Sequence, residues 1–218
     1  MGSLTGAPSG IGREFAHQLA DAGINVVLVA RRLAMLQDLG AALTRGYGID
    51  YRAVGVDLSE PGMLTLNTAA HLGLSHHFGE RLARRGRGGI VLVSALGAIH
   101  GVPDMAHTAA TKAYVASLGA GLHVELAKRG VHVTVLHPGP TRTPVMTELG
   151  LDPGKMPIPP MAPHDCVSEA LRALERNRAR CIPGRINRMS AALVPSALTR
   201  SMMARMLSRP ASVNTAAQ

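Results

Sequence analysis

Apolar residues change their spacing several times along the chain, and each change marks a different predicted element. Between 10 and 21, Ile11, Phe15 and Leu19 recur every four positions, which predicts a helix with one buried face. Segment 25–30 is instead a run of apolar and β-branched residues after Asn25, which predicts a strand. The same criteria predict strands at 51–56, 90–93, 131–136 and 180–182, and helices at 33–43, 63–83, 108–128 and 163–178.

The alternation of strands and helices sets the expected fold class. It predicts an α/β protein with a doubly wound parallel sheet, covered by helices on both faces, in a single domain. Residues 1–4 can form only the stub of a first strand. Proline-rich residues 150–163 predict an irregular, mobile flap, which we place at about 144–163. We expect a domain at 1–189 and a basic amphipathic extension at 190–218.

Composition narrows the setting in which this fold works. The chain has 218 residues, of which 46% are hydrophobic, enough for one sizeable core. It contains no apolar run of membrane-spanning length, and Met1–Leu4 does not resemble a signal peptide. Cys166 and Cys181 are too few for a disulfide framework or a zinc site, which favours a reducing cytoplasm. The ten histidines show no metal-ligand spacing, so we expect no metal site.

Positive charge is concentrated toward the end of the chain. The formal net charge is +9, and arginines continue after Glu175 while acidic residues do not. Such a segment suits nucleic acid, anionic lipid or acidic partners, but 2% aromatic residues and no Trp leave little for base stacking. We therefore expect no nucleic-acid partner and keep peripheral membrane contact through 190–218 as an alternative. The other interpretation buries the same apolar stripe in a dimer or over a substrate cleft.

A glycine-rich turn opens the chain and carries the strongest chemical signal. In the stretch Thr5–Gly12, Gly6 permits a tight turn, Gly10 a close backbone approach, and Gly12 close packing of helix on strand. The N-terminus of the helix that follows presents unpaired N–H groups and the positive end of its dipole. The turn therefore predicts a site for the pyrophosphate of a dinucleotide.

Further motifs follow this turn in an order that resembles the short-chain dehydrogenase/reductase family across nearly the whole chain. Asp57 resembles the acidic residue that contacts the adenine, and Asn67 the helix asparagine of the proton relay. Residues 89–94 resemble the strand that leads to the active site. Lys112 falls in the helix that carries YxxxK, and Pro138-Gly139-Pro140-Thr141-Arg142-Thr143 resembles the loop that closes over the nicotinamide. The resemblance implies a Rossmann-like fold, a small-molecule substrate and a homo-oligomer formed through 108–128.

The choice of coenzyme can be argued from charge. Strand 25–30 is followed by Arg31 and Arg32, where an NAD enzyme places an acid for the ribose 2′-hydroxyl. Guanidinium groups suit a 2′-phosphate, so NADP(H) is favoured over NAD(H). The expected coenzyme-binding residues are Gly6, Ser9, Gly10, Ile11, Gly12, Arg31, Arg32, Asp57, Lys112, Pro138, Gly139, Thr141 and Thr143.

The catalytic set departs from the family pattern at two positions. Thr108 stands four residues before Lys112, where the family has its tyrosine, and Ala95 stands where the family has its serine. An aliphatic hydroxyl is too weak an acid to replace a phenol, and Tyr114 points away from the face of Lys112. Lys112, Asn67 and Thr108 remain as the catalytic candidates. Losing a positioned general acid costs about 10²–10⁴-fold in rate.

A second departure concerns the centre of the sheet. Only 58–66 separates Asp57 from Asn67, and the family's NNAG strand is missing. Unpaired edges would strand buried N–H and C=O groups at about 1–3 kcal/mol each. Our hypothesis is that 90–94 moves inward and pairs with the stub at 1–5, with 63–83 as the crossover. The alternative is a shortened gene product that folds poorly.

Three functions remain open at this stage. The first is an NADP(H)-dependent oxidoreductase with impaired activity on a lipophilic carbonyl or hydroxyl compound. The second is a non-catalytic scaffold that binds NADP, a pseudoenzyme. The third is a module that lies on a membrane surface through its C-terminal extension.

Overall fold

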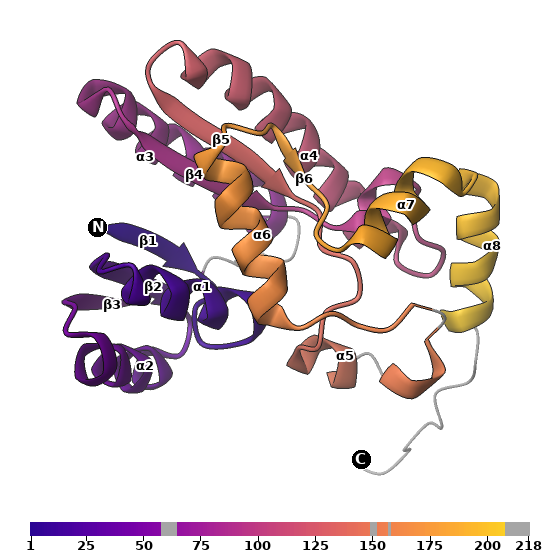
Figure 1. Cartoon of the computed structure of the whole chain (residues 1–218), viewed down its shortest axis with the longest axis horizontal. Coiled ribbons are helices and arrows are strands. Elements are labelled where there is room, and N and C mark those ends of the chain that lie inside the picture. Colours follow the sequence, from indigo (N-terminus) through magenta and orange to yellow (C-terminus); the bar gives the residue numbers. More distant parts are fainter. Residues whose placement is uncertain (58–64, 149–151, 157, 208–218) are drawn as a thin grey trace.

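Six parallel strands form two separate sheets in the computed structural model, which describes residues 1–57, 65–148, 152–156 and 158–207 (Figure 1). The first sheet has the order β1-β2-β3 and the second β4-β5-β6. The strands of the two sheets are β1 (Gly2–Thr5), β2 (Val26–Ala30), β3 (Tyr51–Gly55), β4 (Gly88–Val93), β5 (Val131–Leu136) and β6 (Arg180–Cys181). Leu4 lies opposite Leu28, and Ile90 opposite Val133.

Helices connect successive strands, which confirms the α/β fold class. The helices are α1 (Gly10–Asp21), α2 (Leu33–Tyr47), α3 (Ala70–Arg85), α4 (Ala106–Ala127), α5 (Pro144–Glu148), α6 (Pro163–Glu175), α7 (Arg185–Leu193) and α8 (Ser196–Leu207). A π-helical turn, Thr65–Ala69, leads into α3. The earlier part of the predicted helix 63–83 lies outside the described residues.

The expected pairing of the fourth strand with the first is wrong. Among the described residues β4 pairs only with β5, and β1 only with β2, so the two sheets keep separate edges. The hypothesis considered only the cost of leaving backbone N–H and C=O groups unpaired at the strand edges. Helices can also hold two sheets together, because they bury apolar side chains against both. Phe15 of α1 and Leu136 of β5 belong to one core cluster, and Leu4 of β1 packs against it.

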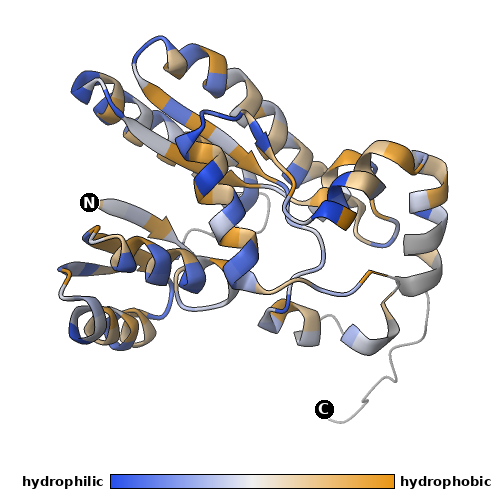
Figure 2. Cartoon of the chain, viewed as in Figure 1, coloured by the Kyte–Doolittle hydropathy of each residue, from blue (hydrophilic) through white to orange (hydrophobic). Residues whose placement is uncertain are grey.

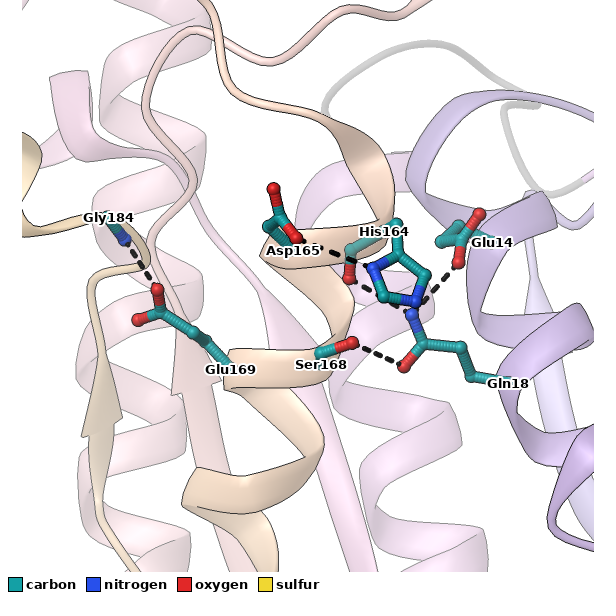
Figure 3. Close-up of polar contacts among 7 residues, drawn as sticks. All are labelled: Glu14, Gln18, His164, Asp165, Ser168, Glu169 and Gly184. Atoms are coloured by element: carbon teal, nitrogen blue, oxygen red, sulfur yellow. Dashed lines mark hydrogen bonds and ion pairs between the residues drawn. The ribbon is translucent and has the colours of Figure 1, made fainter.

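Helix α6 carries most of this connection. Cys166, Val167 and Ala170 are buried on its inner face, while Figure 2 shows strongly polar residues elsewhere on the same helix. Gln18 of α1 binds α6 twice, because its amide nitrogen donates to the His164 carbonyl (3.0 Å) and its oxygen accepts from Ser168 (3.1 Å; Figure 3). Packing between α1 and α6 therefore holds the two sheets together.

Two helices separated by a proline occupy the described part of the basic amphipathic extension expected at 190–218. Helix α7 begins earlier, at Arg185, and ends before Val194, whose backbone is extended. Pro195 follows directly, and the residue before a proline is disfavoured in the helical conformation. Helix α8 begins after it. Residues 208–218 of the predicted extension lie outside the described residues.

The expected flap contains short regular pieces. Besides α5, a 3₁₀ turn spans Pro153–Lys155, where the Asp152 carboxylate accepts a hydrogen bond from the Gly154 amide (2.9 Å). Thr141 and Met161 form a parallel bridge that joins the two ends of the segment. Residues 149–151 and 157 lie outside the described part.

Candidate coenzyme and active site

The glycine turn has the backbone geometry that its sequence predicts. Gly6 and Gly10 adopt φ values of +68° and +55°, a conformation that favours glycine. A Cβ at Gly12 would collide with the Gly6 carbonyl oxygen and lie 2.8 Å from its carbonyl carbon. A Cβ at Gly6, in contrast, would meet nothing within 4 Å. The turn is thus closed behind Gly12 and open in front of Gly6.

The N-terminus of α1 has backbone N–H groups that make no hydrogen bond within the helix. The first intrahelical bond is donated by Arg13 to the Ser9 carbonyl (3.2 Å), so the amides of Gly10, Ile11 and Gly12 precede it. Ser9 is the N-cap, yet its side chain makes no capping bond within the described structure. Backbone donors and a positive dipole end therefore converge where a diphosphate would be bound.

The loop after β5 lies directly across from the turn. A Cβ at Gly10 would be 3.2 Å from Cβ and Cγ2 of Thr143, so these two residues are close neighbours. The loop is fixed internally, because the Thr141 hydroxyl donates to the Gly139 carbonyl (3.0 Å) and the Arg142 amide donates to Met161 (3.0 Å). The structure thus brings the two ends of the predicted coenzyme site together.

The remaining predicted coenzyme contacts lie at the carboxyl ends of adjacent strands. Arg31 and Arg32 are exposed and follow β2. Asp57 is exposed just after β3, whose Gly55 is paired with Ala30. The Val56 amide continues the ladder by donating to Ala30 (3.0 Å). This set and the open turn fit a dinucleotide with an extra phosphate near the arginines.

Asn67 is linked to the backbone of α4 through two hydrogen bonds that meet at Thr111. The Asn67 amide donates to the Thr111 hydroxyl (3.0 Å), and this hydroxyl donates to the Thr108 carbonyl (2.9 Å). Asn67 and Thr111 are both buried, so each bond replaces lost hydration. Asn67 thus reaches the backbone carbonyl of Thr108 through Thr111, a residue that sequence reasoning missed.

Lys112 points its ammonium group toward the end of β4. Its Nζ donates to the Val93 carbonyl (3.0 Å), and burial lowers the pKa of the Lys112 side chain from its ordinary value. Ser94 is also occupied, because its hydroxyl donates to the Lys112 carbonyl (2.7 Å). Ser94 is therefore a structural residue that fixes α4 on β4.

The described residues around Lys112 include no phenol in the family position. Thr108 is half-buried on the same side of α4 as Lys112, four residues away. His107 and Tyr114 are exposed. Ala95 offers only a methyl group, so Thr108 has the one side-chain hydroxyl at the two substituted positions.

Two buried polar residues near the site were not expected. His137 directly follows β5, and its Nδ1 lies 3.3 Å from the Ala95 carbonyl oxygen. Burial lowers the pKa of His137, the bond to Ala95 opposes this shift, and the charge of Arg180 adds to it. Asn187 of α7 packs on the coenzyme loop, where a Cβ at Gly139 would lie 2.7 Å from its amide group. The sequence around Asn187 gives no signal of this contact with the loop at Gly139.

The two thiols are poor candidates for chemistry. Both are free and buried on α6 and β6. Burial, with Cys181 adding to it, raises the pKa of Cys166 to about 12, and burial raises the pKa of Cys181 to about 11. Both remain neutral thiols near pH 7, which are weak nucleophiles.

Comparisons with known proteins agree with this geometry. The short chain dehydrogenase family model matches residues 3–64 and 61–154, two stretches that overlap at 61–64. A 7beta-hydroxysteroid dehydrogenase of Collinsella aerofaciens is 26% identical, over 79% of this chain and 82% of that protein. An uncharacterized oxidoreductase of Mycobacterium tuberculosis is 30% identical, over 62% of this chain and 71% of its own.

Solved structures give the same answer. A short-chain dehydrogenase from Sphingobium yanoikuyae in complex with NADPH has a TM-score of 0.78 and 26% identity, covering 100% of this chain and 99% of its own. A 7beta-hydroxysteroid dehydrogenase structure has a TM-score of 0.83 and 25% identity, covering 93% and 95%. With its glycine turn, its opposed loop and Lys112 arranged as described, the chain belongs to the short-chain dehydrogenase/reductase family.

Proposed function

We propose that this protein is an NADP(H)-dependent oxidoreductase with slow turnover, acting on a hydroxyl or carbonyl group of a small lipophilic compound. The observation that carries the proposal is the turn at Gly6–Gly12, open at its front and opposed by Thr143. When bound, the coenzyme supplies or accepts a hydride. The chain's own residues bind it, orient it and exclude water.

The arginine pair supports NADP(H) over NAD(H). Arg31 and Arg32 are exposed beside the turn, and a related structure was solved with NADPH. Calorimetric titration of the full chain should give at least tenfold tighter binding of NADPH than of NADH. Arg31→Ala with Arg32→Ala should remove this preference, whereas Arg45→Ala with Arg52→Ala, an equal charge change elsewhere, should keep it. No heat with either coenzyme from well-folded protein would refute the proposal.

The relatives suggest which substrates to test first. Several of them are 7beta-hydroxysteroid dehydrogenases, and Met161, which is hydrogen-bonded to the loop at Pro140 and Arg142, offers an apolar side chain there. We therefore propose a bulky apolar alcohol or ketone, and a panel of hydroxysteroids and their ketones is the first test. Turnover only with small polar alcohols would contradict this substrate class.

The missing phenol and serine hydroxyl explain the proposed low rate. Lys112 and the Thr108 hydroxyl lie on one side of α4, but neither supplies a proton with the acidity of a lysine-activated tyrosine. Thr108→Tyr with Ala95→Ser should raise kcat about 10²-fold or more in the presence of NADPH. Tyr114→Phe, which alters an exposed tyrosine on the same helix, should leave kcat unchanged.

One observation favours a second candidate, a non-catalytic scaffold that binds NADP. The Lys112 ammonium already donates to the Val93 carbonyl, and the Asn67 amide donates to Thr111. Both candidates for the proton relay therefore make hydrogen bonds that stabilise the fold. The scaffold predicts NADPH binding without turnover across the panel. It also predicts that Thr108→Tyr with Ala95→Ser restores nothing, which separates it from the slow enzyme.

Self-association is a further part of the proposal. Helix α4 corresponds to the helix through which the family often assembles, and Val124 on it is 62% exposed. Light scattering should show a dimer or tetramer, and Val124→Lys should shift the protein toward monomer.

A further inference from the structure

Helix α7 exposes an apolar stripe that the enzyme site does not use. Ile186, Met189 and Leu193 are 58%, 60% and 72% exposed, and their spacing of three and four places them on one side of the helix. Asn187, between them in sequence, is buried and turns the opposite side toward the protein. Figure 2 shows apolar and polar residues side by side on this helix.

Next to α7 lies a cavity of about 390 Å³ with an unusual lining. It is formed by α6, β6 and α7, and its charged lining residues are Arg172, Arg176, Arg178, Arg180, Arg188 and Glu169. Glu169 is the one acidic residue in this lining, and its carboxylate pairs with Arg188 at 2.6 Å while also accepting from the Gly184 amide. Four further guanidinium groups therefore line the same cavity without another carboxylate among them.

A second, smaller cavity connects the arginines with α7. It has a volume of about 240 Å³ and shares Arg180, Ile182 and Arg188 with the first. Ala191 and Ala192 of α7 complete it. Met189 of the exposed stripe lies three residues before Ala192 on α7, so the stripe begins beside this second cavity. None of these residues is among those placed at the coenzyme site.

We propose that this region, the α7 surface (Arg172, Arg176, Arg178, Arg180, Arg188, Ile186, Met189 and Leu193), binds a membrane that contains anionic phospholipid. Lipid phosphate groups enter the arginine-lined cavity, and the apolar stripe enters the boundary between headgroups and acyl chains. No helix in the described part of the chain is long and apolar enough to cross a bilayer, so contact is peripheral.

Charge and hydrophobicity together favour this occupant over others. A second copy docked face to face would set the arginines of one cavity against those of the other, with Glu169 already paired. A free phosphate compound would leave the stripe of α7 uncovered. An anionic bilayer satisfies both halves of the surface, because it offers many phosphates beside an apolar layer.

Cosedimentation of the full chain with vesicles tests the proposal. Vesicles of phosphatidylcholine with one third phosphatidylglycerol should bind the protein, and pure phosphatidylcholine should bind at least tenfold less. Arg172→Gln, Arg176→Gln and Arg180→Gln together should weaken binding about 100-fold, roughly fivefold for each charge. Met189→Gln with Leu193→Gln should weaken it at least tenfold.

Matched controls separate the α7 surface from net charge and general stickiness. Arg81→Gln, Arg85→Gln and Arg87→Gln remove the same number of charges from exposed positions in the last part of α3 and just after it. This triple variant should keep most of its vesicle binding. Leu72→Gln with Met35→Gln, also exposed, should do the same. Equal losses with the controls would overturn the proposal, as would the absence of vesicle binding. Calorimetric binding of pyrophosphate in the cavity without vesicle binding would also overturn it. Thermal unfolding of each variant confirms that it is folded.

Discussion

At the scale of single residues, Gly12 is the position with least room for change. A Cβ there would collide with the backbone of Gly6, which no side-chain rotation relieves. Gly12→Ala should therefore lower the free energy of unfolding by about 1–3 kcal/mol and abolish NADPH binding by calorimetry. Gly73→Ala is the control, since its Cβ meets nothing within 4 Å inside α3, and it should stabilise the protein by about 0.5–1 kcal/mol.

A second residue-scale prediction concerns His137. Because burial lowers its pKa in the folded protein below 6.5, the unfolded chain binds the proton more readily. Its contribution to stability is present above pH 6.5 and is lost as the pH falls toward the folded-state pKa, with a slope of at most about 1.4 kcal/mol per pH unit. Urea unfolding between pH 8 and pH 5 should show this loss. The His137→Gln variant should show a flatter profile, and an identical profile would contradict the assignment.

At the scale of elements, the contact between α1 and α6 is the joint that the sequence did not reveal. Gln18 makes two hydrogen bonds across it, to His164 and Ser168. Gln18→Ala should lower the free energy of unfolding by about 1–2 kcal/mol. A double-mutant cycle with Ser168→Ala should give a favourable coupling energy of about 0.5 kcal/mol or more. Glu80→Ala, which breaks an exposed ion pair with Arg84, should change stability by less than about 0.5 kcal/mol.

The sequence predicted elements best where local signals act alone. The strand and helix order, the glycine turn and the break after β5 follow from periodicity and from glycine and proline chemistry, which are local. Thr111, His137 and Asn187 escaped notice because their roles depend on contacts with distant segments. The helix break at Pro195 follows from the rule for residues before proline, which the prediction of a basic amphipathic extension at 190–218 did not use.

At the scale of the whole molecule, the division into two sheets is the main difference from the expected arrangement. Gly2 and Gly6 donate their amides to β2, so alternation turns the amides of Ser3 and Thr5 toward the edge that faces away from β2. In hydrogen exchange, Ser3 and Thr5 should therefore exchange much faster than Leu28, at the centre of the same sheet. Equal protection would mean that a partner covers the edge.

The reason this arrangement was not predicted is physical. The cost of unpaired backbone groups favours pairing β1 with β4 in one continuous sheet. The core cluster around Leu4, Phe15 and Val167 shows that apolar burial under α6 can hold the two sheets together without this pairing. Burial of this kind is not directional and leaves no motif. The family and its coenzyme turn were therefore readable in the chain, and the topology of its centre was not.

The contact between Asn187 and Gly139 connects the proposed lipid-binding helix α7 with the loop of the proposed coenzyme site. One side of α7 faces outward, and on another side of the helix the buried Asn187 amide packs against the loop at Gly139. Any effect of occupancy at one place on affinity at the other must be the same factor in both directions. If vesicles tighten NADPH binding severalfold, NADPH must tighten vesicle attachment equally, and Asn187→Ala should uncouple them.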